Sequence, residues 1–277
     1  MDDAPCRTSG AGTLSRRRLL CQLRDATVGA LLLPVVSLVR AEQERTTLKP
    51  GVLRIGTYFV NPPFEFISAG ARFGFEVELM KEIAQRLGLQ PEFVNTRWEV
   101  ILHQMQQNLY DCIVGGITIT PDRQRSLAWS TPYMTTTLSL LVDAAKSPAN
   151  MTLADLKGAT VGVQAATTDY DAAVAMQRAG EIGSVKVYSF ARIADAITDL
   201  AAGRVNAVMK VYPVAAWFAR NTPGVRILAQ VPGDPQPLGI GFSKTNGGLV
   251  AAVDNALTQM QQDGSYKTIE QHWGLRG

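Results

Sequence analysis

A glycine pair, a threonine and an arginine near the middle of the chain have the chemistry to bind a small anion. Gly115 and Gly116 directly follow a short apolar run, so their N–H groups can approach a ligand closely. Thr118 adds a hydroxyl group, and the planar guanidinium of Arg123 suits a carboxylate. The alternative for Arg123 is a solvated position at the start of a helix. We favour a carboxylate site.

A second polar segment, from Gln164 to Thr168, lies between an apolar run and a helical pattern. Backbone N–H groups at a helix N-terminus attract anions, so Gln164, Thr167 and Thr168 could contact the same ligand. Thr168 could also cap that helix, and the two roles are compatible.

These segments are positioned by strands and helices that alternate along the chain. We expect strands at about 52–56, 92–94, 110–114, 136–142, 159–163, 185–188, 206–210, 225–229 and 238–242. We expect helices at about 75–87, 101–109, 169–178, 193–202, 249–262 and 266–273, another between residues 210 and 225, and a capped turn at 152–155. Such alternation predicts an α/β fold with mostly parallel sheets flanked by helices.

The first 41 residues have the anatomy of an export signal. An arginine-rich segment precedes 14 apolar or small residues, Ala26 to Val39, which are too few to span a bilayer as a helix of roughly 20 residues. Ser15 to Leu20 resembles a twin-arginine motif, although an ordinary secretory signal would also fit. We therefore predict residues 1–41 to be cleaved and the rest to be a soluble periplasmic protein.

The basic balance of the chain, a net charge of +3, comes from this leader. Six of the 27 basic residues and three of the 24 acidic ones lie in residues 1–41, which leaves 21 of each in the remainder. A neutral body gives no reason to expect a nucleic-acid partner.

The sequence gives little support for catalysis. Cys112 lies alone in an apolar run, and His103 and His272 are far apart without metal-ligand spacing. We expect no catalytic residue, no metal and no cofactor.

Several short motifs, in this order, resemble the amino-acid-type periplasmic solute-binding proteins of ABC importers (bacterial extracellular solute-binding proteins, family 3). The resemblance covers roughly residues 48–275. It is carried by Leu53–Thr57, Pro62–Phe66, Gly74–Leu79, Trp98, Tyr110–Asp111, Gly116–Arg123, Ser130–Tyr133, Val161–Gln164, Gly264–Tyr266 and Trp273–Gly274.

The resemblance implies two α/β lobes joined by two hinge strands and closing over a ligand. Lobe one would comprise residues 42–141 and 236–277, and lobe two residues 142–235. The family assigns Arg123, with Gly116 and Thr118, to the ligand carboxylate. It also implies a monomer that delivers its ligand to an ABC permease in the inner membrane.

Three residues of lobe one should form the part of the site that contacts the ligand side chain. Trp98 stands where the family often has an aromatic wall, with core packing as the alternative. Tyr58 and Asn61 lie in the loop that usually sets specificity. Many relatives have an acidic residue at Tyr58, so its tyrosine argues against a cationic side chain on the ligand.

The sequence departs from the family pattern at the position that commonly binds the ligand's ammonium group. The family commonly holds it with an aspartate where this chain has Val211, preceded by Lys210. Lys210 could hold a second carboxylate or a keto oxygen, or it could point to solvent if the alignment register is shifted. A dicarboxylate, an oxo acid or an unusual amino-acid derivative therefore joins the standard amino acid as a possible ligand.

We expect a binding protein and not an enzyme. The alternatives are a lyase on the same scaffold, resembling cyclohexadienyl dehydratases, and the ligand-binding component of a sensory system, whose fold and site would be identical.

Overall fold

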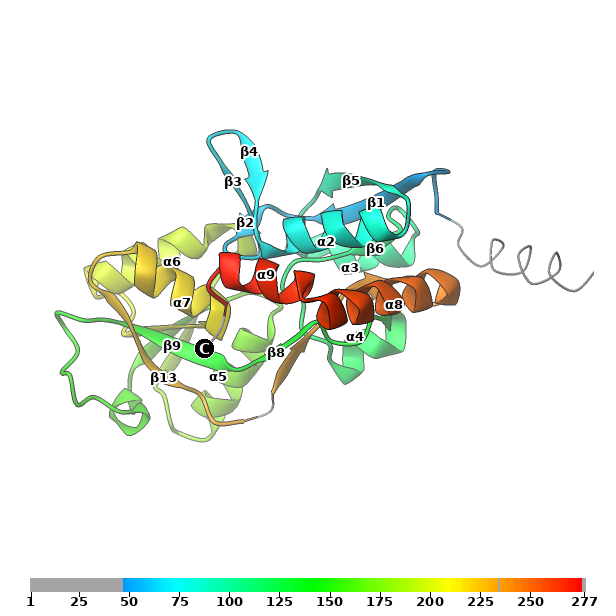
Figure 1. Cartoon of the computed structure of the whole chain (residues 1–277). Coiled ribbons are helices and arrows are strands. Elements are labelled where there is room, and N and C mark those ends of the chain that lie inside the picture. Colours follow the sequence, from blue (N-terminus) through cyan, green and yellow to red (C-terminus); the bar gives the residue numbers. More distant parts are fainter. Residues whose placement is uncertain (1–46, 234, 276–277) are drawn as a thin grey trace, which may run out of the picture. The chain divides into compact units, whose positions relative to one another are not determined.

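Two five-stranded sheets organise the part of the chain that the computed structural model describes, residues 47–233 and 235–275 (Figure 1). These residues belong to one compact unit, residues 44–277. The predicted export signal, residues 1–41, lies outside the described residues.

The first sheet has the strand order β5 (Gln90–Asn95), β1 (Val52–Thr57), β6 (Cys112–Ile113), β15 (Gly241–Phe242) and β7 (Ala128–Trp129). β1 runs parallel to β5 and β6, whereas β15 runs antiparallel to β6 and β7. Cys112 and Ile113 belong to different hydrophobic clusters because successive strand side chains point to opposite faces. Helix α3 (Trp98–Gln106) packs on one face with Ile113. The other face is covered by α2 (Phe75–Arg86) and α8 (Gly247–Asp263), against which α9 (Ser265–His272) packs.

The second sheet has the order β11 (Ser184–Tyr188), β10 (Thr160–Gln164), β12 (Ala207–Val211), β9 (Leu138–Asp143) and β13 (Val225–Gln230). The first three strands are parallel, and β9 is antiparallel to both of its neighbours. Helices α5 (Thr168–Arg178), α6 (Ile193–Ala202) and α7 (Tyr212–Asn221) connect the strands. Short 3₁₀ turns occur at Leu153–Leu156, where Thr152 and Asp155 form the predicted cap, and at Phe190–Arg192.

Two short strands join the sheets. β8 (Met134–Thr136) leads into β9, β14 (Gln236–Leu238) follows β13, and the two pair antiparallel. β9 pairs only within the second sheet, so that sheet begins a few residues before position 142. We propose the division into two lobes on the basis of these two connecting strands.

The strand and helix pattern was predicted well where the burial is periodic, and poorly in short segments. The hairpin sheet β2 (Val60–Asn61), β3 (Glu65–Ser68) and β4 (Ala71–Phe73) was not predicted. The helix α4 (Pro121–Ser126) was expected only in the alternative for Arg123. The helix expected at about 101–109 begins and ends three residues earlier. Helix α3 ends at Gln106, Asn108 has φ 56°, and Leu109 is 44% exposed. Within the described residues, no helix has the length and apolar character needed to cross a bilayer.

Candidate functional site

A small cavity lies between the two sheets and is lined from both sides. The first sheet and its loops contribute Tyr58, Asn61, Trp98, Gly115, Gly116, Ile117, Thr118 and Arg123, and the second contributes Thr167, Thr168, Asp169, Phe190, Lys210 and Val211. Ten of the eleven predicted site residues line it, and Gln164 lies behind it. The cavity measures about 30 Å³. That is near the volume of one water molecule, so a metabolite can enter only if side chains or sheets move apart.

Arg123 is held at the edge of this cavity by three contacts. Its Nη1 donates to the carbonyl of Thr118 at 2.7 Å, and its Nη2 donates to the carbonyl of Ala166, across the cavity, at 3.5 Å. The guanidinium also lies over the Trp98 ring, 5.0 Å from its centroid. Burial lowers the pKa of Arg123. Arg123 thus lies near the start of α4, as the alternative expected, but its guanidinium contacts the protein and borders the cavity.

Gly115 and Gly116 make room for the protein's own side chains. A Cβ at Gly115 would lie 2.1 Å from the Tyr58 hydroxyl, and one at Gly116 would lie 2.7 Å from the Phe64 ring. The N–H of Gly116 donates to both carboxylate oxygens of Glu76 at 3.0 Å. This corrects the expectation that the Gly116 N–H faces a ligand.

Glu76 and Glu65 form a buried acidic pair behind the glycines. Glu76 also accepts a hydrogen bond from the Tyr133 hydroxyl, whereas neither carboxyl oxygen of Glu65 has a hydrogen-bond partner. Burial, followed by the charge of Glu76, raises the pKa of Glu65 well above its ordinary value. Burial and the neighbouring Glu76 carboxylate therefore both favour the protonated form of Glu65.

On the opposite wall, helix α5 begins beside the cavity. Thr167, and not Thr168 as expected, caps it by accepting a hydrogen bond from the N–H of Tyr170 at 3.3 Å. Thr168 is the first helical residue and lines the cavity. Gln164 does not reach the cavity because its amide binds the Phe190 carbonyl and the Lys210 ammonium.

Lys210 is buried and paired with an acid that the sequence reasoning missed. Its Nζ lies 2.8 Å from Oδ2 of Asp169, and the side chains of Lys210 and Asp169 are 4% and 2% exposed. The alternative in which Lys210 points to solvent is therefore wrong. Asp169 lies in the first turn of α5, directly after Thr168. The signal that could have revealed it is its place at the same predicted helix start as Thr167 and Thr168.

Three aromatic rings close the cavity between the sheets. The centroid of Tyr58 lies 4.7 Å from Phe190 and 6.0 Å from Trp98, and Trp98 lies 5.3 Å from Phe190. Trp98 Nε1 also donates across the cavity to the Ala165 carbonyl at 3.1 Å. Trp98 thus lines the cavity and packs in the core at once. Phe190 was not predicted because it follows a strand without any polar signal.

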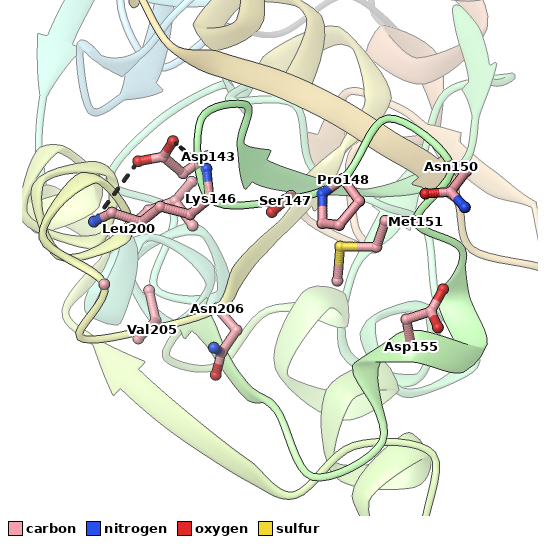
Figure 2. Close-up of a pocket in the computed structure, with 11 residues that line it drawn as sticks. Asp143, Lys146, Ser147, Pro148, Asn150, Met151, Asp155, Leu200, Val205 and Asn206 are labelled. Carbon is pink, nitrogen blue, oxygen red and sulfur yellow. Dashed lines mark hydrogen bonds and ion pairs between the residues drawn. The ribbon is translucent and has the colours of Figure 1, made fainter.

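A second cavity, of about 340 Å³, lies beside β9 and α6, away from these residues (Figure 2). Figure 2 shows Lys146 directed toward Asp143, and its Nζ also binds the Ala201 carbonyl. Asp155 binds the hydroxyl and the N–H of Thr152, and Asn206 accepts from the N–H of Thr160. Because these polar groups serve local structure, we do not assign a ligand to this cavity.

No group of His, Cys, Asp and Glu suited to a metal ion occurs among residues 47–233 and 235–275. Cys112 is buried in β6, and burial raises the pKa of its thiol. This environment is that of a packing residue.

Comparison with known proteins places this geometry in a family. Residues 53–276 match the model of bacterial extracellular solute-binding proteins, family 3. The chain is 27% identical to ABC transporter arginine-binding protein 1 of Escherichia coli K12 over 80% of this chain and 90% of that protein. It is 28% identical to L-cystine-binding protein TcyJ of the same strain over 85% of each.

A solved structure has the same two-lobed arrangement. It is the ancestral amino acid-binding protein AncCDT-1, a precursor of cyclohexadienyl dehydratase, with a TM-score of 0.71 and 30% identity over 86% of this chain and 98% of that one. The fold is therefore the two-lobed periplasmic binding protein fold, and the chain belongs to the bacterial extracellular solute-binding proteins, family 3.

Proposed function

We propose that this protein is the periplasmic solute-binding component of an ABC importer and that it captures a small carboxylate metabolite, an amino acid or a related acid. The observation that carries the proposal is the cavity lined from both sheets, with Arg123 on one wall and the start of α5 on the other. A guanidinium and the N–H groups of a helix start are both suited to a carboxylate.

Capture proceeds by closure about the β8–β14 connection. The carboxylate binds first on lobe one through Arg123 and Thr118, and lobe two then adds the Thr167–Thr168 turn. The hydrogen bonds from Trp98 to Ala165 and from Arg123 to Ala166 join the two walls, so opening must break both. The closed form presents the surface that a permease recognises.

The ligand side chain faces aromatic groups. Tyr58, Trp98 and Phe190 line the cavity and suit an apolar or aromatic side chain, whereas Tyr58 offers a cationic one no carboxylate. Two similar proteins are named for arginine and cystine, so ligand identity differs among relatives.

A lyase is the less favoured function, although a similar ancestral protein is described as a precursor of a dehydratase. General acid catalysis needs a carboxyl group that can exchange a proton with the substrate. Asp169, the acid among the lining residues, is paired with Lys210. Capture without chemistry therefore fits better. A sensory role would use the same site, and a neighbouring permease and ATPase in the genome would favour import.

We further propose that residues 1–41 are removed on export, by the twin-arginine route, and that the mature protein is a periplasmic monomer. The periplasmic relatives and the apolar run at 26–39 support this assignment.

The test is ligand binding by Arg123→Ala. The protein would be freed of co-purified ligand by partial unfolding and refolding, and thermal shifts would be recorded against amino acids, oxo acids, hydroxy acids and dicarboxylates. We expect the substitution to weaken carboxylate binding by about a hundredfold, because the ligand loses its charged partner. Arg125→Ala is the matched control, since Arg125 is 72% exposed and pairs with Asp122. Unchanged affinity in Arg123→Ala would overturn the site.

A further inference from the structure

The charges that line the cavity do not balance. Of the described lining residues, Arg123 and Lys210 are cationic and Asp169 is anionic. Lys210 and Asp169 neutralise each other, which leaves Arg123 without a counter-charge in the lining. Asp171, the next acid of α5, acts electrostatically on Arg123, but it is exposed and does not line this cavity. A ligand with one net negative charge would complete the balance, whereas a zwitterionic amino acid would not.

Several hydrogen-bond acceptors around the cavity are already in use. The carbonyl of Gly115 accepts from Tyr58 and Asn61, that of Thr118 from Arg123, that of Ala165 from Trp98, and the side-chain oxygen of Gln164 from Lys210. A ligand ammonium group brings three N–H donors and needs acceptors for them. Among the described residues that line the cavity, the carboxylate is that of Asp169, which the ammonium would have to share with Lys210.

Donors, in contrast, are in excess. Within the described residues, no hydrogen bond uses the backbone N–H groups of Thr168 and Asp169 or the hydroxyls of Thr118 and Thr168. Together with Arg123 they outnumber the two oxygens of one carboxylate. A further oxygen on the ligand, next to its carboxylate, would find a donor among these groups. An ammonium would meet the neutral threonine hydroxyls as acceptors, and the carboxylate in the described lining, that of Asp169, is already paired.

We propose that the natural ligand is a monocarboxylate without an ammonium group, with an oxo or hydroxy oxygen beside the carboxylate and an apolar side chain against Tyr58, Trp98 and Phe190. This inference rests on the proposed function and narrows its ligand class. Lys210 acts in it as a specificity residue, because its pairing with Asp169 removes the carboxylate that an ammonium needs.

The test compares ligands that differ only at the second carbon. Isothermal titration of the purified full chain would use L-leucine, 4-methyl-2-oxopentanoate and 2-hydroxy-4-methylpentanoate, and then L-phenylalanine with phenylpyruvate and L-alanine with pyruvate. In at least one set, we expect the oxo or hydroxy acid to bind about ten to a hundred times more tightly than the amino acid. Dicarboxylates should bind more weakly, since Lys210 is already paired.

Lys210→Met should reverse this preference. The variant frees the Asp169 carboxylate for an ammonium group, so the amino acid should gain affinity and the oxo acid should lose it. Lys186→Met is the matched control. It breaks a second lysine–aspartate pair, Lys186 with Asp199 at 2.6 Å, outside the cavity, and should leave both affinities unchanged.

The double variant Lys210→Met/Asp169→Asn keeps the test usable if Lys210→Met does not fold. It removes both charges and leaves Arg123, so it should keep the wild-type preference for the acid. A preference for the amino acid in this variant would overturn the inference.

The outcomes separate the inference from the proposed function. Tighter binding of the amino acid than of its oxo acid in the wild type, or an unreversed preference in a folded Lys210→Met, would overturn the inference and leave a solute-binding protein. If no carboxylate in either class binds, the proposed function fails and the inference fails with it.

Discussion

Two lysine–aspartate pairs in the second lobe have similar lengths and very different surroundings. Lys210 and Asp169 lie 2.8 Å apart with side chains 4% and 2% exposed, whereas Lys186 and Asp199 lie 2.6 Å apart with side chains 42% and 13% exposed. Asp199 also accepts hydrogen bonds from Tyr188 and Arg204. Hydrogen bonds from Lys186, Tyr188 and Arg204 hold the pKa of Asp199 well below its ordinary value.

The two pairs differ in burial, and we expect them to differ in how far each affects protein stability and ligand specificity. An exposed pair contributes little, because water and salt screen it and two long side chains must be ordered. A buried pair recovers its desolvation cost only when the geometry is good, and it gives weak evidence for stability. Lys210 and Asp169 border the cavity, and we propose that their pairing sets which ligand charge the cavity accepts.

The largest expected effect comes from breaking the buried pair on its acidic side. Asp169→Asn leaves the Lys210 ammonium buried without a counter-charge. We expect a loss of about 2–3 kcal/mol in the free energy of unfolding, at or below the low end of the range for broken buried pairs, because opening the lobes would let water reach Lys210. Urea denaturation at neutral pH would measure it. A loss no greater than that of Lys186→Met would mean that burial does not distinguish the two pairs.

Some features of this region could be predicted from the sequence, and others could not. Helix α6 has the predicted bounds, 193–202, because five of its residues are buried with helical spacing and Gly203 follows in the left-handed conformation. The residues predicted to bind a carboxylate also line one cavity, because strand ends and helix starts meet there. A local pattern was sufficient for the helix, whereas the site residues came from local chemistry together with the family resemblance.

Asp169 could not be found in the same way. An aspartate in the first turn of a helix is ordinary, since it favours the helix dipole, and nothing local reveals that Lys210 lies opposite. That contact joins two residues that are 41 positions apart in the sequence, one at the start of α5 and the other in β12. The glycines were misread for a similar reason, because the rings that need the space, Tyr58 and Phe64, are more than 50 residues away in sequence.

Glu65, a buried acid beside a second acid, gives the second prediction. Because the pKa of Glu65 is raised in the folded protein, its contribution to stability is full below the ordinary carboxyl pKa and is lost as pH rises through the raised value. Glu65→Gln cannot ionise, so it should lose less stability than the wild type between pH 5 and pH 8. Thermal unfolding across that range would measure the difference.

Exposed Glu99 supplies the control for Glu65. Glu99→Gln changes the same chemical group at the solvent-facing start of α3 and should keep the wild-type dependence on pH. If Glu65→Gln follows the wild-type curve as well, the Glu65 carboxyl does not hold a proton at neutral pH. In that case the charge of Glu76 must be screened by some route other than protonation of its neighbour.

The smallest expected effect belongs to the exposed pair. Lys186→Met should lower the urea midpoint only slightly at low ionic strength, and the difference should disappear at about 1 M salt, where the screening length is about 3 Å. The Asp169→Asn loss should change less in the same salt, because the side chains of Lys210 and Asp169 are 4% and 2% exposed and buried charges are screened less. A salt-insensitive Lys186→Met would show that the lysine acts through the packing of its methylene groups on β11, and that charge is not what holds Asp199 in place.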